Sequence, residues 1–352
     1  MQRVKLNQSF KGIMLASLAA CLILAACSVT QAPPPTPTVA PKPTSTLIPI
    51  PTATPTPLPS GIESNPIVLG IVSETNDPAA LAAAGQITKS IQQLTGYVMV
   101  ARSYPSYFLL VSDLSVGKVQ VAFLPPLTYL YARSLGYAKV VMVANHFGVY
   151  QYGSRFFANV AGQFKSYYNP DTNRSTADAA VALAQFNGKQ PCWVDSTSPS
   201  GYVLPLGIMK TQNFTPADGA FLASPVGVIR ALYITGICDF GATFATTGDP
   251  RTSTSVTQDL TDVMNRVVVI WQSDPVIPNM NISFHPSIKP EMRDDLIYGF
   301  KDLLKNDSGK NALSTANNYE ILDLKQVDDS FYDPLNNLVR QTGINLLNLV
   351  GR

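Results

Sequence analysis

The residues best suited to chemistry lie in a hydroxyl-rich stretch in the middle of the chain. The segment CWVDSTSPSGYVLPLGIM, residues 192–209, places three serines and a threonine between Asp195 and Gly201. A strand is predicted to end near Asp195 and a helix to begin at Gly201. The first N–H groups of a helix lack partners within the helix, and its dipole places positive charge there. Serine hydroxyls can donate further hydrogen bonds. The stretch is therefore typical of a site for a carboxylate, phosphate or phosphonate.

Two other functions of these serines have to be weighed. Ser198 or Ser200 could simply cap its own helix, as most serines at such positions do. Either could also be a hydrolase nucleophile, but no G-x-S-x-G turn is present, and only His146 and His285 could act as the base. We therefore expect no catalytic residue and no enzymatic activity.

The segments around this stretch alternate between strand and helix patterns. Ile67–Val72 is predicted to be a buried strand, and Asp77 and Pro78 then begin a helix that Gly96 ends. Further strands are predicted at 119–124, 139–144, 155–160, 192–195, 237–242 and 267–271. Helices are predicted near 106–116, 127–135, 175–187, 201–211, 225–235 and 256–264, and the chain from Pro290 onward is mostly helical. This order predicts an α/β architecture with mainly parallel sheets covered by helices on both faces.

The N-terminus resembles a bacterial lipoprotein signal peptide. Residues 1–11 carry three basic side chains and no acid, residues 12–26 are apolar or small, and LAAC ends at Cys27. A second LAAC ends at Cys21, but cutting there would leave too short an apolar segment. A plain transmembrane anchor is the alternative, and fifteen apolar residues fall short of the roughly 20 needed to span a bilayer. We expect 1–26 to be removed and Cys27 to be lipidated.

Proline and threonine dominate the next segment, residues 27–60. Such a composition cannot form a core and favours an extended tether, long enough to hold a domain on the order of 80 Å from a membrane. Simple disorder would have the same consequence.

Composition excludes several functions for the rest of the chain, residues 61–352. Loss of residues 1–26 changes the net charge from +2 to −1, because three basic residues and no acids are removed. With this net negative charge, we expect no nucleic-acid partner. With two histidines in the whole chain, we expect no histidine-rich metal site. No pattern indicates a cofactor.

Cys192 and Cys238 could form one disulfide outside the cytoplasm or remain two buried thiols.

Four blocks of the chain resemble the phosphate/phosphonate-type solute-binding proteins of ABC importers. They are SYFLLVSDLSVGKVQVAFLPPLTYLYA (106–132), VDSTSPSGYVLP (194–205), RALYITGICDFGAT (230–243) and VVVIWQSDPVIPN (267–279). They follow one another in the family's order, and with the flanking elements the resemblance covers most of 62–352.

The resemblance implies a type II periplasmic-binding-protein fold, with two α/β lobes joined by two crossovers and a ligand cleft between the lobes. Lobe one would comprise 62–148 plus 275–352, and lobe two 149–274. In this fold the strands that begin near Cys192 and Cys238 should be neighbours, which would permit the disulfide. The family's ligand contacts correspond here to Tyr107, Leu124, Pro125, Tyr152, Ser198, Ser200 and Gly201.

The chain also departs from the family pattern. Pro199 replaces a threonine of the serine loop, and Val226 replaces a histidine. Members that bind aminoethylphosphonate use acidic residues where this chain has Thr246 and Met280, so an ammonium group would lack its counter-charge. We therefore expect a small anion without an amine: phosphate, phosphite or a simple alkylphosphonate.

The resemblance also implies partners and a location. The protein would capture its ligand outside the cytoplasm, anchored to the membrane through Cys27, and deliver it to an ABC permease. A sensor that reports to a membrane receptor would have the same fold and site, so this alternative stays open.

Overall fold

The computed structural model describes residues 59–73 and 75–350 of the 352-residue chain. The predicted signal peptide, Cys27 and nearly all of the predicted tether lie outside the described residues. Among the described helices, none combines the length and apolar character that crossing a bilayer requires.

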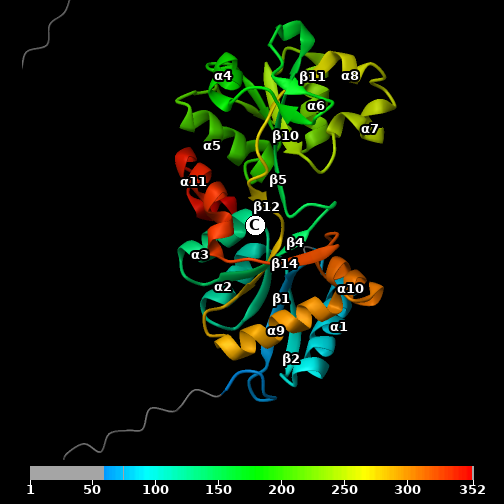
Figure 1. The fold of residues 1–352 in the computed structure, drawn as a ribbon, viewed down its shortest axis with the longest axis vertical. Helices are drawn as coiled ribbons and strands as arrows, with labels where there is room; N and C mark the ends of the chain where they lie inside the picture. The colour runs from blue at the N-terminus through cyan, green and yellow to red at the C-terminus, as the bar shows by residue number, and fades with distance from the viewer. Residues whose placement is uncertain (1–58, 74, 351–352) are drawn as a thin grey trace, which may run out of the picture. The chain divides into compact units, whose positions relative to one another are not determined.

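Lobe one is built on a six-stranded sheet with the order β14-β4-β13-β3-β1-β2 (Figure 1). Its strands are β1 (Ile67–Val72), β2 (Met99–Tyr104), β3 (Val121–Leu124), β4 (Lys139–Asn145), β13 (Asn281–Phe284) and β14 (Asp323–Gln326). Helices α1 (Pro78–Thr95), α9 (Pro290–Leu303) and α10 (Asp307–Asn317) cover one face, and α2 (Tyr107–Ser115) and α3 (Pro126–Ser134) cover the other. Side chains alternate along β1, so that Leu69 packs in the α1 core and Val68 in the α2 core.

Lobe two is built on a second sheet with the order β11-β5-β10-β8-β9. Its strands are β5 (Gln151–Asn159), β8 (Pro191–Trp193), β9 (Ala220–Phe221), β10 (Phe240–Ala245) and β11 (Val267–Gln272). Helices α4 (Ala179–Leu183) and α5 (Leu204–Thr211) cover one face, and α6 (Pro225–Ile234), α7 (Thr254–Thr257) and α8 (Val263–Arg266) cover the other. A small hairpin, β6 (Tyr168–Asn169) and β7 (Arg174–Ser175), lies beside β11.

Two crossovers, residues 146–150 and 273–280, join the lobes. They lie side by side, because β12 (Ile277–Pro278) in the second crossover pairs with Gln151 and Tyr152 at the start of β5. Helix α11 (Asp333–Thr342) comes from the C-terminal part assigned to lobe one, yet it packs against α5 of lobe two (Figure 1).

The sheets are mixed, and the prediction of mainly parallel sheets is wrong. Strands β1, β2 and β3 are parallel, as are β8, β9 and β10. Strands β5 and β13 are antiparallel to both neighbours within their sheets. The reason is topological: β5 and β13 enter their sheets directly from a crossover, so they run away from the edge at which the parallel strands end.

Other differences arise where the local pattern is weak. Strands β2, β13 and β14 were not predicted; β14, at the sheet edge, has one buried residue, Leu324, and so gives no apolar alternation. The helix predicted at 175–187 is α4 followed by a 3₁₀ turn, and the helix predicted at 256–264 is divided into α7 and α8.

A disulfide joins Cys192 and Cys238, whose Cα atoms are 5.6 Å apart. Cys192 lies in β8 opposite Gly241 of the neighbouring strand β10. The sequence left open whether these cysteines form a disulfide or remain two buried thiols, and the structure contains the disulfide.

Replacing both cysteines with alanine is expected to lower the free energy of unfolding by about 2–4 kcal/mol, because the bond restricts the unfolded chain between them. Urea denaturation of the variant and the oxidised protein measures this loss. Mass spectrometry of the non-reduced protein should find neither thiol free, and two alkylatable thiols would contradict the bond.

Candidate functional site

The hydroxyl-rich stretch forms a tight turn at the start of α5. Ser198 is its N-cap, and its Oγ accepts a hydrogen bond from the Gly201 N–H at 3.0 Å. Pro199–Val203 form a π-helical turn that continues into α5, with the Val203 N–H donating to the Ser198 carbonyl at 3.0 Å. Ser198 therefore has the capping role that was the simpler alternative. We call residues 198–203 the anion loop.

Ser200 points from this loop onto the first residues of β5. It is 7% exposed, and its hydroxyl lies near that of Tyr152. Ser154, two residues further along the same face of β5, donates from Oγ to the Ser200 carbonyl at 2.8 Å. Burial raises the pKa of Tyr152, and the contact with Ser200 opposes this rise. Tyr152 is thus a neutral phenol at physiological pH, able to donate a hydrogen bond to an anion.

Gly201 is required by close packing under the loop. A Cβ placed on Gly201 would overlap the Val194 side chain and lie 2.9 Å from the Ser198 Oγ. The backbone is also fixed from both sides, since the Val194 N–H donates to the Gly201 carbonyl at 3.2 Å. Side chains larger than hydrogen cannot occupy this position without moving the loop.

The loop retains donors for a ligand. Within 59–73 and 75–350, the Ser200 N–H has no hydrogen-bond acceptor. It lies in the first turn of the helical segment, where unpaired N–H groups and the helix dipole favour an anion. Pro199 contributes no N–H, so the loop has one donor fewer than a non-proline residue would give it.

The lobe-one candidates lie where the parallel strands of that sheet end. Tyr107 is the first residue of α2, Leu124 is the fully buried last residue of β3, and Pro125 is the N-cap of α3. No side chain caps the start of α3. Its first residue, Pro126, lacks an N–H, so Leu127 carries the first backbone N–H of the helix. Carboxyl ends of parallel strands are the usual ligand edge of an open α/β sheet.

The structure thus joins four of the seven predicted contacts directly: Tyr152, Ser198, Ser200 and Gly201. Tyr107, Leu124 and Pro125 belong to the other lobe.

Sequence reasoning missed Ser154, although strand alternation from Tyr152 could have identified it. Tyr319, which the sequence also did not mark, lies near Tyr152, and its ring stacks on His146 at 4.0 Å. Burial raises the pKa of Tyr319, and nearby Tyr152 adds to the rise. No local pattern marks Tyr319, because it follows the unrelated helix α10.

Thr246 and Met280, the two positions at which an acid would compensate an ammonium group, provide no carboxylate. Thr246 follows β10, is exposed and has a φ of 79°. Met280 is 7% exposed and packs in the core beneath α1.

A hollow of about 760 Å³ lies beside the second crossover. It is bounded by Thr246, Trp271, Asp274, Ile208 of α5 and Leu338 of α11, among others. None of the seven predicted contacts lines it.

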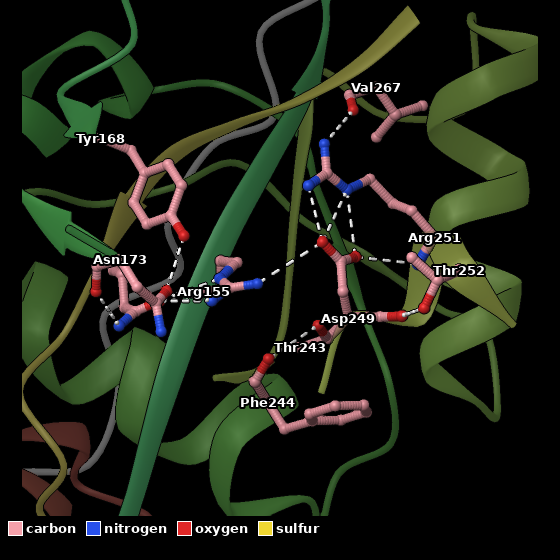
Figure 2. Close-up of polar contacts among 10 residues, drawn as sticks. Arg155, Tyr168, Asn173, Thr243, Phe244, Asp249, Arg251, Thr252 and Val267 are labelled. Carbon is pink, nitrogen blue, oxygen red and sulfur yellow. Dashed lines mark hydrogen bonds and ion pairs between the residues drawn. The ribbon is translucent and has the colours of Figure 1, made fainter. Parts of the chain in front are cut away.

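A buried charge cluster anchors the loop after β10 (Figure 2). Asp249 accepts hydrogen bonds from Arg251 at 2.6–3.1 Å and lies 3.5 Å from the Arg155 guanidinium. Arg155 also donates to Gln272 and Asn173, both of which border the hollow. The arginine side chains are 6% and 10% exposed. The single negative charge of Asp249 therefore compensates the positive charges of two buried arginines.

In the part of the chain that the structure describes, the two histidines bond partners other than Ser198 and Ser200. The His146 Nδ1 bonds the Glu320 carbonyl, and the His285 Nδ1 contacts the Ser287 hydroxyl at 2.8 Å. Neither ring bonds Ser198 or Ser200 in the part of the chain described. In the same residues, no three His, Cys, Asp or Glu side chains gather as metal ligands would.

Comparison with known proteins adds independent information. The family described as ABC transporter, phosphonate, periplasmic substrate-binding protein matches residues 69–332, which is 264 of the 352 residues. No curated protein matches the chain significantly.

Solved structures show a similar fold at low identity. The Xanthomonas citri protein XAC2383 bound to chloride ion is 15% identical, with a TM-score of 0.55 over 79% of this chain and 97% of that one. The same protein has been solved with ATP. PhnD1 from Prochlorococcus marinus in complex with methylphosphonate is 12% identical, with a TM-score of 0.50 over 79% and 98% of the two chains.

Proposed function

Since the chain belongs to the family of periplasmic substrate-binding proteins of phosphonate ABC transporters, we propose that it captures a small phosphorus oxyanion between its lobes. The fold is the expected type II periplasmic-binding-protein fold, with two α/β lobes joined by two crossovers. A protein of this family works outside the cytoplasm and delivers a small ligand to a permease.

The anion loop is the observation that carries the proposal. It presents the Ser200 N–H at a helix start, and the Ser200 hydroxyl lies beside the neutral phenol of Tyr152. Hydrogen bonds to a charged partner contribute about 1.5–3 kcal/mol each, so a few such donors can give useful affinity. Tyr107 and the uncapped start of α3 would supply the lobe-one contacts when the lobes close.

We further propose that the ligand lacks an amine: phosphate, phosphite or a simple alkylphosphonate. Thr246 and Met280 offer no carboxylate to an ammonium group, and burying such a group without a counter-charge is costly. Cys27 would be lipidated and would anchor the protein to the membrane through the tether.

A thermal-shift screen tests the proposal. The purified protein is heated with phosphate, phosphite, methylphosphonate, aminoethylphosphonate, sulfate or methanesulfonate. A ligand at about 100 times its dissociation constant should add about 2.7 kcal/mol of stability and raise the melting temperature measurably. We expect the rise with amine-free phosphorus oxyanions. Tighter binding of aminoethylphosphonate would overturn the amine-free assignment, and no rise with any phosphorus oxyanion would overturn the ligand class.

A further inference from the structure

Helix α11 is held by lobe one at both of its ends. Before it, the Tyr332 hydroxyl accepts a hydrogen bond from Asn281 of β13 at 2.7 Å, and the Tyr332 ring packs on Tyr129 of α3 at 4.3 Å. After it, the 3₁₀ turn Leu346–Leu349 packs on α3. Lobe one therefore fixes where α11 can lie.

Between these ends, α11 packs closely on α5 of lobe two (Figure 1). A Cβ placed on Gly207 would overlap the Leu338 carbonyl oxygen and lie 2.9 Å from the carbonyl carbon. Lys210 extends from the last turn of α5, and its Nζ donates to the Thr342 carbonyl at 3.0 Å. Glycine at 207 lets the two backbones approach, and Lys210 bonds a carbonyl at the end of α11.

Apolar side chains complete this contact. Ile208 of α5 and Leu335 and Val339 of α11 belong to one buried cluster, which continues through both lobes. Leu338 and Ile208 also border the hollow beside the second crossover. The α5–α11 contact is thus a packed interface between elements of different lobes.

Helix α5 continues the anion loop without a break, because the π-helical turn Pro199–Val203 passes directly into Leu204–Thr211. We infer that α11 positions the anion loop by fixing the axis of α5, and that Gly207 and Lys210 are positioning residues for ligand binding. This inference rests on the proposed function. Neither residue touches the ligand; each acts through the direction in which α5 presents the Ser200 N–H.

A short helix such as α5 moves as a rigid body. If α11 is displaced from Gly207, α5 tilts, and the loop at its N-terminal end moves relative to the donors of lobe one. Charge-assisted hydrogen bonds depend strongly on distance and angle, so a small displacement weakens several of them together.

The test uses Gly207→Ala and Lys210→Met. Gly85→Ala is the matched control, because Gly85 lies in helix α1 with no atom within 4 Å of an added Cβ. Lys89→Met, an exposed lysine of the same helix, is the control for Lys210. Methylphosphonate affinity is measured by calorimetry, and amide exchange of residues 201–203 is measured without ligand.

We expect both α5 variants to bind methylphosphonate at least about tenfold more weakly than their controls, the effect of misaligning one charge-assisted hydrogen bond. Exchange at 201–203 should accelerate in the α5 variants while the β1 and β5 amides keep their protection. Unchanged affinity and unchanged exchange in Lys210→Met would overturn the inference even if Gly207→Ala fails to fold. If the parent protein does not bind methylphosphonate, that ligand assignment fails, and exchange at 201–203 alone decides the role of α11.

Discussion

Asp249→Asn is expected to lower the free energy of unfolding by about 3–5 kcal/mol, because it leaves two buried arginines without their counter-charge. Asparagine has nearly the same shape, but its amide carries no charge and directs N–H groups toward guanidinium donors. The loss arises from electrostatics and not from packing. Urea denaturation followed by circular dichroism measures it.

Asp259→Asn is the matched control. Asp259 also pairs with an arginine, Arg230, at 2.8 Å, but these side chains are 58% and 36% exposed. Water solvates both partners after the substitution, so little change is expected. Equal effects of the two substitutions would show that burial of the Asp249 cluster does not matter for stability.

The same cluster predicts how stability depends on pH. Burial opposes ionisation of Asp249, but its bonds to Arg251 and the charge of Arg155 outweigh this and hold its pKa below the usual 3.8. A depressed pKa in the folded state stabilises the fold above the unfolded-state pKa, and this contribution is lost as pH falls through the folded pKa. Unfolding free energy should therefore decline below about pH 4, and less steeply in Asp249→Asn.

Gly201→Ala is expected to weaken binding of a phosphorus oxyanion by about 100-fold, the loss of one to two hydrogen bonds to a charged ligand. The added methyl group would overlap Val194, the residue after β8, so the anion loop must lift away from it. This lift would disturb both the Ser198 cap and the Ser200–Tyr152 contact. Calorimetric titration with the anion that best stabilises the parent protein measures the effect.

Two further variants separate the loop from general stability. Gly85→Ala adds the same methyl group in an open helical position and should leave affinity unchanged. Ser200→Ala removes only one hydroxyl and should cost about tenfold in affinity. If Gly201→Ala binds as tightly as the parent protein, the anion loop is not the ligand site.

Long apolar runs and clear helix signals were sufficient to predict several elements from sequence. Ile67–Val72 and the helix from Pro78 to Thr95 have the predicted bounds, and the Asp77 side chain caps that helix as expected. The family blocks predicted the two-lobed fold, which is confirmed. Short or edge strands such as β14 could not be predicted, because their partners, and not their own apolar pattern, keep them extended.

The sequence by itself determined where the hydroxyls, the glycine and the helix starts of the proposed anion site lie, since these are local properties. Only the tertiary structure decided how these groups are used. It assigned Ser198 to a cap, placed Ser200 on Tyr152, paired Asp249 with Arg155 and brought α11 onto α5. Apart from the Ser198 cap, which bonds the nearby Gly201, these contacts join residues distant in the chain, and their geometry depends on how the sheets, helices and crossovers pack together.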